Sequence, residues 1–398
     1  MPSLIPITEK FTDEQITAAL DAVLAAHPVL SMRIDIRDSG PYLVMGEKPA
    51  VLKGSYNLVS MVKRLTTGFD ITKVLSRHMI VRCFGKCYLV SVVHHIVFDV
   101  ISGNVFKRVF LNALNGVIPT YVDDAFLKVS AFHQQVQNTD DYAQMDKYTR
   151  SMMGNFEGVG LYKNPGKPGR TGYVIKELTV SREQVKKCTE KFRISKNILF
   201  TVAKACTMSS LTGKDKVFYG FVENGRDRFR NYDAIGLYIN TMPLVAKVGG
   251  LKMGELIEDF SDMYYMLNRY NFYSYGPTYQ EFDLFPVTLF QFLPDWVIDD
   301  GGYDELPLNK HLIDLILSRF SDLLVQAIIE VVEKKNGYAL RIYYSGYYTK
   351  AMMKTFADTY DQILCNLMEA DENTASKDVL IPASAKGKPR RKKAAANK

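Results

Sequence analysis

Two adjacent histidines, His94 and His95, are the residues in this sequence best suited to chemistry, and Asp99 follows four positions after the second. Adjacent residues of a strand point to opposite faces, so one imidazole can face a cavity while the other packs inward. A neutral imidazole can accept a proton from an attacking amine or alcohol, or orient it. A carboxylate in the turn that follows can fix local geometry or hold a cation. A histidine at the end of an apolar strand can equally be a core residue with satisfied hydrogen bonds.

Other kinds of chemistry find less support in the sequence. Adjacent histidines cannot easily ligate one ion, and Cys83 and Cys87 precede them without the spacing of a zinc site, so we expect no metal. The sequence contains no GxxxxGK[ST], no GxGxxG after a strand and no GxSxG. The five cysteines are scattered and odd in number, which is typical of a reducing compartment.

The elements that must position the histidines follow from the pattern of apolar residues. Residues 81–84 and 88–93 predict two strands around the Gly85-Lys86 turn, and the second is apolar on both faces, as in a central strand. Residues 102–115 predict a helix with Ser102 as its N-cap. Strands and helices mix in both halves of the chain, so we expect an α/β protein with two lobes.

Length and composition indicate how the chain divides into lobes. With 398 residues, 47% of them hydrophobic and 23% charged, it is long enough for two or three structural units. Glycine and proline are frequent between residues 154 and 172, so we predict an N-terminal lobe at 1–160, a linker at 161–172 and a C-terminal lobe at 173–380.

The last segment, 381–398, carries seven lysines and arginines and no acidic residue. Its charge of +7 equals the net charge of the whole chain, so the rest of the chain has no net charge. We predict a flexible basic tail and no nucleic-acid partner. The sequence shows no signal-like start and no apolar stretch that would span a membrane, so we expect a cytoplasmic protein without membrane contact.

Residues 94–102, HHIVFDVIS, resemble the HHxxxDGxS motif of nonribosomal peptide synthetase condensation domains and, more broadly, the chloramphenicol-acetyltransferase-like superfamily. Two further segments occur in the order of that family. Residues 26–30, AHPVL, are similar to its HPxLR segment. Gly225-Arg226 and residues 235–244, IGLYINTMPL, are similar to its GR…IGxFxNTxPL segment. The resemblance covers most of residues 4–380.

The sequence departs from the family pattern in three places. The opening helix segment of the family is missing before Leu4, so we interpret the chain as an excised or shortened version of the family domain. Ser31 stands where the family usually has arginine, and the nearby Arg33 is the expected partner of Asp99. Val100 replaces the motif glycine, and because a β-branched residue disfavours positive φ, we expect the turn geometry to change there.

The resemblance implies an acyl transfer between two thioesters. An acyl or peptidyl group would pass from a carrier-protein thioester to the amine of an acceptor aminoacyl thioester. His95 would accept the proton of the amine or orient it, His94 would support the strand from its other face, and Asp99 would brace the turn. Further residues would support or shape the site: Arg33, Ser102, Gly236 and Asn240.

The resemblance also implies an architecture and partners. Two chloramphenicol-acetyltransferase-like lobes would form a V-shaped pseudo-dimer with an active-site tunnel between them. No metal or directly bound cofactor is implied, because phosphopantetheine would arrive on the donor and acceptor carrier proteins. We expect a monomer that works with such carriers, which can belong to adjacent modules of the same synthetase.

Two alternatives stay open at this point. The first is a stand-alone acyltransferase that uses coenzyme A or an alcohol acceptor, in which base catalysis by His95 would matter more because an alcohol is a poor nucleophile. The second is a degenerate domain that only docks carrier or tailoring proteins. Val100, Ser31 and the missing opening segment favour the second, whereas His95 and Asp99 favour an enzyme.

Overall fold

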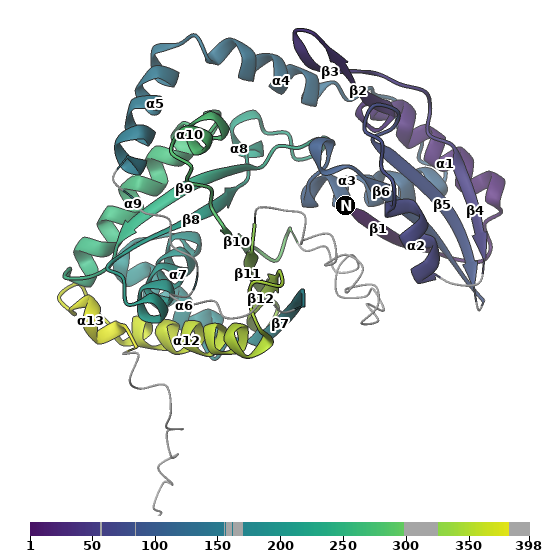
Figure 1. The fold of residues 1–398 in the computed structure, drawn as a ribbon. Coiled ribbons are helices and arrows are strands. Elements are labelled where there is room, and N and C mark those ends of the chain that lie inside the picture. The colour runs from purple at the N-terminus through teal and green to yellow at the C-terminus, as the bar shows by residue number, and fades with distance from the viewer. Residues whose placement is uncertain are drawn as a thin grey trace, which may run out of the picture.

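The computed structural model describes most of the chain: residues 1–55, 58–83, 85–154, 156, 161, 170–297 and 325–381. Figure 1 shows two groups of strands and helices, one from each half of the chain. The predicted tail after residue 381 and most of the predicted linker lie outside the described residues.

The N-terminal half builds a four-stranded sheet, which carries the histidine motif at the end of a central strand. In sheet order its strands are β1 (Pro2–Ile7), β6 (Lys86–Val93), β5 (Ser76–Cys83) and β4 (Val51–Ser55). On one face α1 (Asp13–Ala26) and α3 (Val100–Leu114) pack into a common core, and α2 (Leu58–Thr66) covers the other. A separate hairpin joins β2 (Met32–Arg37) to β3 (Gly40–Met45) after the short 3-10 helix η1 (Pro28–Ser31).

The predicted strands at 81–84 and 88–93 fall on β5 and β6, which pair antiparallel around Gly85 at φ +71°. The predicted N-cap of the following helix was wrong. α3 begins at Val100 and is capped by Asp99, whose side chain accepts a hydrogen bond from the Ser102 N–H. The expected change in turn geometry at Val100 was wrong as well, because this residue is the first of a right-handed helix and has no positive φ.

The C-terminal half builds a six-stranded sheet. In sheet order its strands are β7 (Gly172–Glu177), β12 (Gly337–Tyr344), β11 (Ala327–Lys334), β10 (Thr288–Leu293), β8 (Lys216–Glu223) and β9 (Asn240–Lys247). β10 runs parallel to both of its neighbours, and the other pairs are antiparallel.

Helices cover this sheet, and their buried faces form the largest core of the protein. The long helices are α6 (Arg182–Phe192), α7 (Lys196–Thr212), α9 (Met253–Arg269) and α12 (Lys350–Glu369), and short helices are α8 (Arg226–Phe229), α10 (Gly276–Glu281) and α13 (Ser376–Val379). α7 is buried along nearly its whole length, between α12, α9 and the sheet.

Two helices, α4 (Ala125–Val136) and α5 (Asp140–Met153), lead from one half to the other. Figure 1 shows α4 above the C-terminal half and α5 descending along the outer side of that half. Val136, Met145 and Met153 already belong to the core of the C-terminal half. The chain therefore enters that core before the predicted linker, and the boundaries at 160 and 172 stay predictions.

Candidate functional site

His95 lies just past the end of β6, in the short 3-10 helix η2 (His95–Val97), with its side chain exposed. Its Nδ1 lies 2.6 Å from the carbonyl oxygen of Phe98. A carbonyl can only accept, so Nδ1 carries the hydrogen, and in the neutral form of the ring Nε2 keeps its lone pair. The turn therefore fixes the tautomer and leaves Nε2 as the atom that can accept a proton from a substrate.

His94 holds the same turn from inside. Its Nδ1 accepts the backbone N–H of Ile96 at 3.2 Å, and its ring lies 5.8 Å from that of Phe69. Burial, together with the positive charges of the N-terminal amine and of His95, lowers the pKa of His94. An uncharged ring is what an accepting Nδ1 requires, so His94 acts as the cap of the turn, a more specific contact than the predicted support of the strand.

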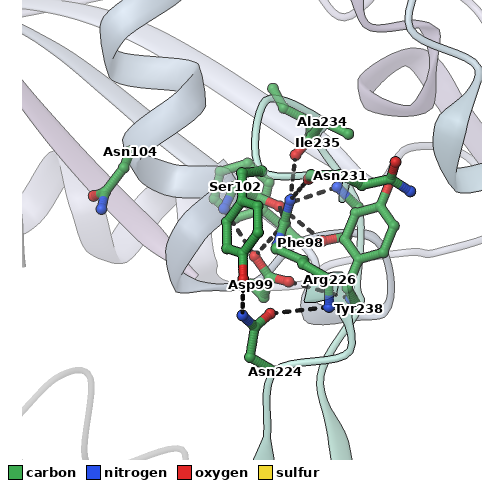
Figure 2. Close-up of polar contacts among 12 residues, drawn as sticks. Phe98, Asp99, Ser102, Asn104, Asn224, Arg226, Asn231, Ala234, Ile235 and Tyr238 are labelled. Atoms are coloured by element: carbon green, nitrogen blue, oxygen red, sulfur yellow. Dashed lines mark hydrogen bonds and ion pairs between the residues drawn. The ribbon is translucent and has the colours of Figure 1, made fainter. Parts of the chain in front are cut away.

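Asp99 is buried, and its carboxylate is fully used by the protein. Oδ1 accepts the Ser102 N–H at 2.8 Å and the Nη2 of Arg226 at 2.7 Å, and Oδ2 accepts the Tyr238 N–H at 3.1 Å (Figure 2). A carboxylate with these partners supports a bracing role better than a role as a base.

The predicted pairing of Arg33 with Asp99 was wrong. Arg33 lies on β2, where its Nη1 is 3.4 Å from Asp35, and its side chain is partly exposed. The partner of Asp99 is Arg226, which is fully buried. Arg226 lies in the Gly225-Arg226 pair that carries part of the family resemblance, so the sequence held the signal, although it did not name the partner.

Arg226 organises the loop that surrounds it. Its Nη1 donates to the carbonyl oxygens of Asn231 and Ala234 at 2.6 and 2.7 Å, and its Nη2 also donates to Ser102 Oγ at 2.8 Å. The guanidinium lies over the ring of Tyr238, 4.2 Å from its centroid. One buried side chain thus closes the loop on itself and ties it to the start of α3 (Figure 2).

We call residues 224–239 the bridging loop, because they leave β8 in the C-terminal half and contact the N-terminal half. Ser102 Oγ donates to the Gly236 carbonyl at 2.7 Å and lies 3.0 Å from the Gly236 N–H. Ile235 is fully buried in the N-terminal core. Of the predicted supporting residues, Ser102 and Gly236 therefore contact each other directly across the two halves.

A second clamp on the bridging loop was not predicted from the sequence. Asp123 Oδ2 accepts the Ile235 N–H at 2.9 Å and lies 2.8 Å from Nδ1 of His27, which is fully buried. The other ring nitrogen of His27 lies 3.2 Å from the hydroxyl of Tyr121. His27 belongs to the HP segment of the resemblance, which was the available signal.

The bridging loop packs so closely that two of its glycines cannot be replaced without movement. A Cβ on Gly225 would lie 2.1 Å from the carbonyl oxygen of Tyr238, and one on Gly236 would lie 2.5 Å from the ring of Phe126. Neither glycine has positive φ, so close approach rather than backbone conformation requires them.

We expect Gly225→Ala to lower the free energy of unfolding by at least about 2 kcal/mol, because the obstacle is a backbone carbonyl and cannot rotate away. Urea unfolding measures this. Gly276→Ala is the matched control, since no atom lies within 4 Å of its added Cβ. Equal stability of the two variants would contradict the close packing of the loop.

Asn240, the remaining predicted residue, lies at the start of β9. Its Nδ2 donates to the carbonyl oxygens of Asn271 and Tyr273 at 2.6 and 3.0 Å. These contacts fix the segment after α9 to the sheet of the C-terminal half. The predicted place of Asn240 opposite His95 in a tunnel stays a prediction.

A buried histidine network lies beside the helix that carries the site. His78 on β5 is fully buried and stacks on Phe106 of α3, with ring centroids 5.9 Å apart. Ser76 Oγ donates to the Leu30 carbonyl, so it accepts from Nε2 of His78 at 2.9 Å, and Ser91 Oγ donates to Nδ1 at 2.9 Å. Burial lowers the pKa of His78 to about 4, so the ring is uncharged near pH 7 and its Nδ1 can accept from Ser91.

This network predicts acid sensitivity. The folded state lowers the pKa of His78 from 6.5 to about 4, so the unfolded chain binds more protons between these values and stability falls as pH falls through them. The loss reaches about 3 kcal/mol near pH 4. We expect His78→Leu to show a shallower decline than the natural chain in urea unfolding between pH 6.5 and 4. Parallel curves would contradict this assignment.

The described residues include no group of three or more histidine, cysteine or acidic side chains that could hold a metal ion. Among the helices formed by those residues, none is long and apolar enough to cross a bilayer. The cytoplasmic location stays a prediction.

Comparison with known proteins gives a consistent answer. The family described as "Condensation domain" matches residues 1–284. The curated protein "Nonribosomal peptide synthetase 30" of Fusarium vanettenii is 23% identical over 298 residues, which cover 65% of this chain and only 5% of that protein. This chain thus corresponds to a small part of the length of the relative.

Solved structures share the fold at low identity. The X-domain from teicoplanin biosynthesis has a TM-score of 0.77 and 14% identity, covering 96% of this chain and 92% of that one. The condensation domain from the Monacolin K polyketide synthase MokA has a TM-score of 0.74 and 14% identity, covering 94% and 93%. The epimerization domain of tyrocidine synthetase B has a TM-score of 0.72 and 15% identity, covering 93% and 92%. These likenesses confirm the predicted chloramphenicol-acetyltransferase-like α/β fold, while the V shape and the tunnel stay predictions.

Proposed function

Because this chain belongs to the condensation domain family, we propose that it forms amide bonds between substrates held on two carrier proteins. An acyl or peptidyl group leaves a donor thioester and joins the amine of an acceptor aminoacyl thioester. The observation that carries the proposal is the exposed His95, whose Nδ1–H is held by the Phe98 carbonyl so that Nε2 is free to accept a proton.

The step balances with this one side chain. The amine nitrogen attacks the thioester carbonyl, a C–N bond forms, and Nε2 of His95 takes the proton that the nitrogen loses. The C–S bond then breaks, and the proton returns to the departing thiolate. An α-amine has a pKa near 8, so a sizeable fraction is already neutral at pH 7 and orientation supplies much of the acceleration.

The rest of the site holds His95 in place. His94 caps the 3-10 turn in which His95 lies, and Asp99 caps α3 directly after it. Arg226 fixes Asp99 from the other half of the chain. Phosphopantetheine takes part as the arm of each carrier substrate, and the protein itself contributes a proton acceptor and a rigid turn.

The alternative of a degenerate docking domain is weakened by Val100. The residue that replaces the motif glycine begins α3 in ordinary helical geometry, so its β-branched side chain imposes no strain on the turn. The turn that presents His95 is intact despite this departure from the motif.

The choice of acceptor and donor separates the proposed function from a stand-alone acyltransferase. The same acyl group is offered on a carrier protein and on coenzyme A, and each donor is paired with an aminoacyl carrier protein or a simple alcohol. We expect product from the two carrier-bound substrates only. Ester formation, or equal rates from coenzyme A, would replace the proposal with the acyltransferase alternative.

A further inference from the structure

A cavity of about 400 Å³ lies between the two halves of the chain, and the proposed transfer step makes no use of it. One wall is a face of α3, a second is the bend of the bridging loop at Tyr232 and Asp233, and a third is the segment after β10 with Trp296 and Val297. The volume is in the range of small-molecule pockets. We call this space the α3 cavity.

The wall formed by α3 runs on from the catalytic motif. Four residues with helical spacing share one face of α3 and line the cavity: Ile101, Asn104, Val105 and Arg108. With a rise of 1.5 Å per residue, this wall begins about 3 Å and ends about 14 Å along the helix from Asp99. The near end of the cavity therefore lies within one helical turn of the residue that braces the His95 turn.

Two aromatic rings, those of Trp296 and Tyr232, line the cavity. Trp296 is 58% exposed, and its indole meets the ring of Tyr232 edge to face, with centroids 5.7 Å apart. Asn104 Nδ2 donates to the Val297 carbonyl at 2.5 Å, which fixes the segment that carries the indole to α3. Two rings at this angle form a corner into which a third planar ring can pack.

The charges of the cavity are already paired. Among the described residues that line it, Arg108 and Asp233 are the charged ones, and they form an ion pair at 2.5 Å with both side chains largely exposed. The apolar part of the lining comes from Ile101, Val105 and the two rings. Because the two charges of this pair cancel, the cavity presents no net charge to a ligand and suits an uncharged planar group.

We propose that the α3 cavity binds the aromatic side chain of the acyl or aminoacyl substrate, which packs between Trp296 and Tyr232 and against Ile101. This inference rests on the proposed transfer function, which places the substrate carbonyl beside His95 at the start of α3. It goes further by naming the class of substrate side chain that the chain prefers.

Trp296 is the single tryptophan of the sequence, so tryptophan fluorescence reports on this cavity alone. The probes are the N-acetylcysteamine thioesters of phenylalanine and of leucine, titrated into the full chain. We expect a saturable change in Trp296 emission with the phenylalanyl thioester and about fivefold weaker binding of the leucyl thioester. Binding of both with equal affinity, or no saturable change, would overturn the inference.

Substitutions of Tyr232 test whether the preference for the phenylalanyl thioester depends on this cavity. Tyr232→Leu, which keeps apolar bulk but removes the ring, should weaken phenylalanyl binding about fivefold and leave leucyl binding unchanged, whereas Tyr232→Ala should weaken both. Tyr265→Ala is the control, because Tyr265, like Tyr232, meets a neighbouring ring edge to face, but it lies on α9. Equal effects of the Tyr232 and Tyr265 variants would contradict the assignment.

The fluorescence readout needs no transfer, which separates this inference from the function on which it rests. Fluorescence change without any amide product would keep the cavity assignment and reject the proposed function. Amide product without a response of Trp296 to the phenylalanyl thioester would keep the function and reject the cavity as a substrate site.

Discussion

Replacing Arg226 by methionine should lower the free energy of unfolding by about 3–5 kcal/mol. The substitution leaves the carboxylate of Asp99 buried without its cation, and removing one member of a buried ion pair is strongly destabilising. It also leaves the Asn231 and Ala234 carbonyls without the donors that close the bridging loop. Urea unfolding followed by circular dichroism measures the loss.

Two further variants test whether the ion pair causes this effect. Arg228→Met changes an exposed arginine of the same short helix and should cost less than about 1 kcal/mol. Adding Asp99→Asn to Arg226→Met removes the uncompensated charge, so the double variant should be more stable than the sum of the single losses predicts. Strict additivity would contradict a direct coupling of Asp99 and Arg226.

The partner of Asp99 could not be predicted from the sequence. The motif with His94, His95 and Asp99 was visible as a pattern, and so was the Gly225-Arg226 pair. The partner of Asp99 was assigned to Arg33 because it was the nearer candidate in a resembling segment. The observed ion pair joins residues 127 positions apart, and only the packing of one half of the chain against the other can specify it.

Local structure at the motif was partly predictable. The strands before His94 follow from their apolar pattern, and Gly85 follows from the turn between them. Both Asp99 and Ser102 are good N-cap residues, and the sequence alone does not decide between them. The structure decides for Asp99, because its carboxylate is held by Arg226 and Tyr238 as well as by the helix.

The helices between the two halves escaped prediction for a physical reason. α5 is polar along most of its surface, and its buried residues are Met145, Thr149 and Met153. One side chain every fourth position is a narrow stripe, which does not stand out among charged neighbours. These side chains become buried only when α5 packs on the core of the C-terminal half, which the local sequence of the helix does not show.

Replacing His95 by alanine should lower the single-turnover rate of amide formation by about 10²-fold. General acid–base catalysis contributes about 10²–10⁴-fold, and the smaller figure applies because a sizeable fraction of the acceptor amine is already neutral. The substitution removes the Nε2 acceptor and the contact from Nδ1 to the Phe98 carbonyl. Rapid-quench sampling with intact-protein mass spectrometry measures the rate.

His94→Asn is the matched control for this loss. Asparagine can accept the Ile96 N–H as the Nδ1 of His94 does, so the turn stays capped while the imidazole is removed. We expect the rate of amide formation by His94→Asn to stay within about threefold of the natural chain, because asparagine still caps the turn. A loss as large as that of His95→Ala would show that His94 takes part in the chemistry, and the roles assigned to the two histidines would then be wrong.

Carrier proteins loaded with defined substrates test directly whether this chain forms an amide bond and whether His95 accepts the proton. The most direct test mixes a donor carrier loaded with an aminoacyl thioester, an acceptor carrier loaded with a second one, and either the natural chain or His95→Ala. Intact-protein mass spectrometry then follows the acceptor carrier. We expect the acceptor carrier to gain the mass of the donor group with the natural chain and to gain it much more slowly with the variant. No gain in mass with either chain, while carrier binding is still detected, would contradict amide formation by this chain and favour a docking domain instead.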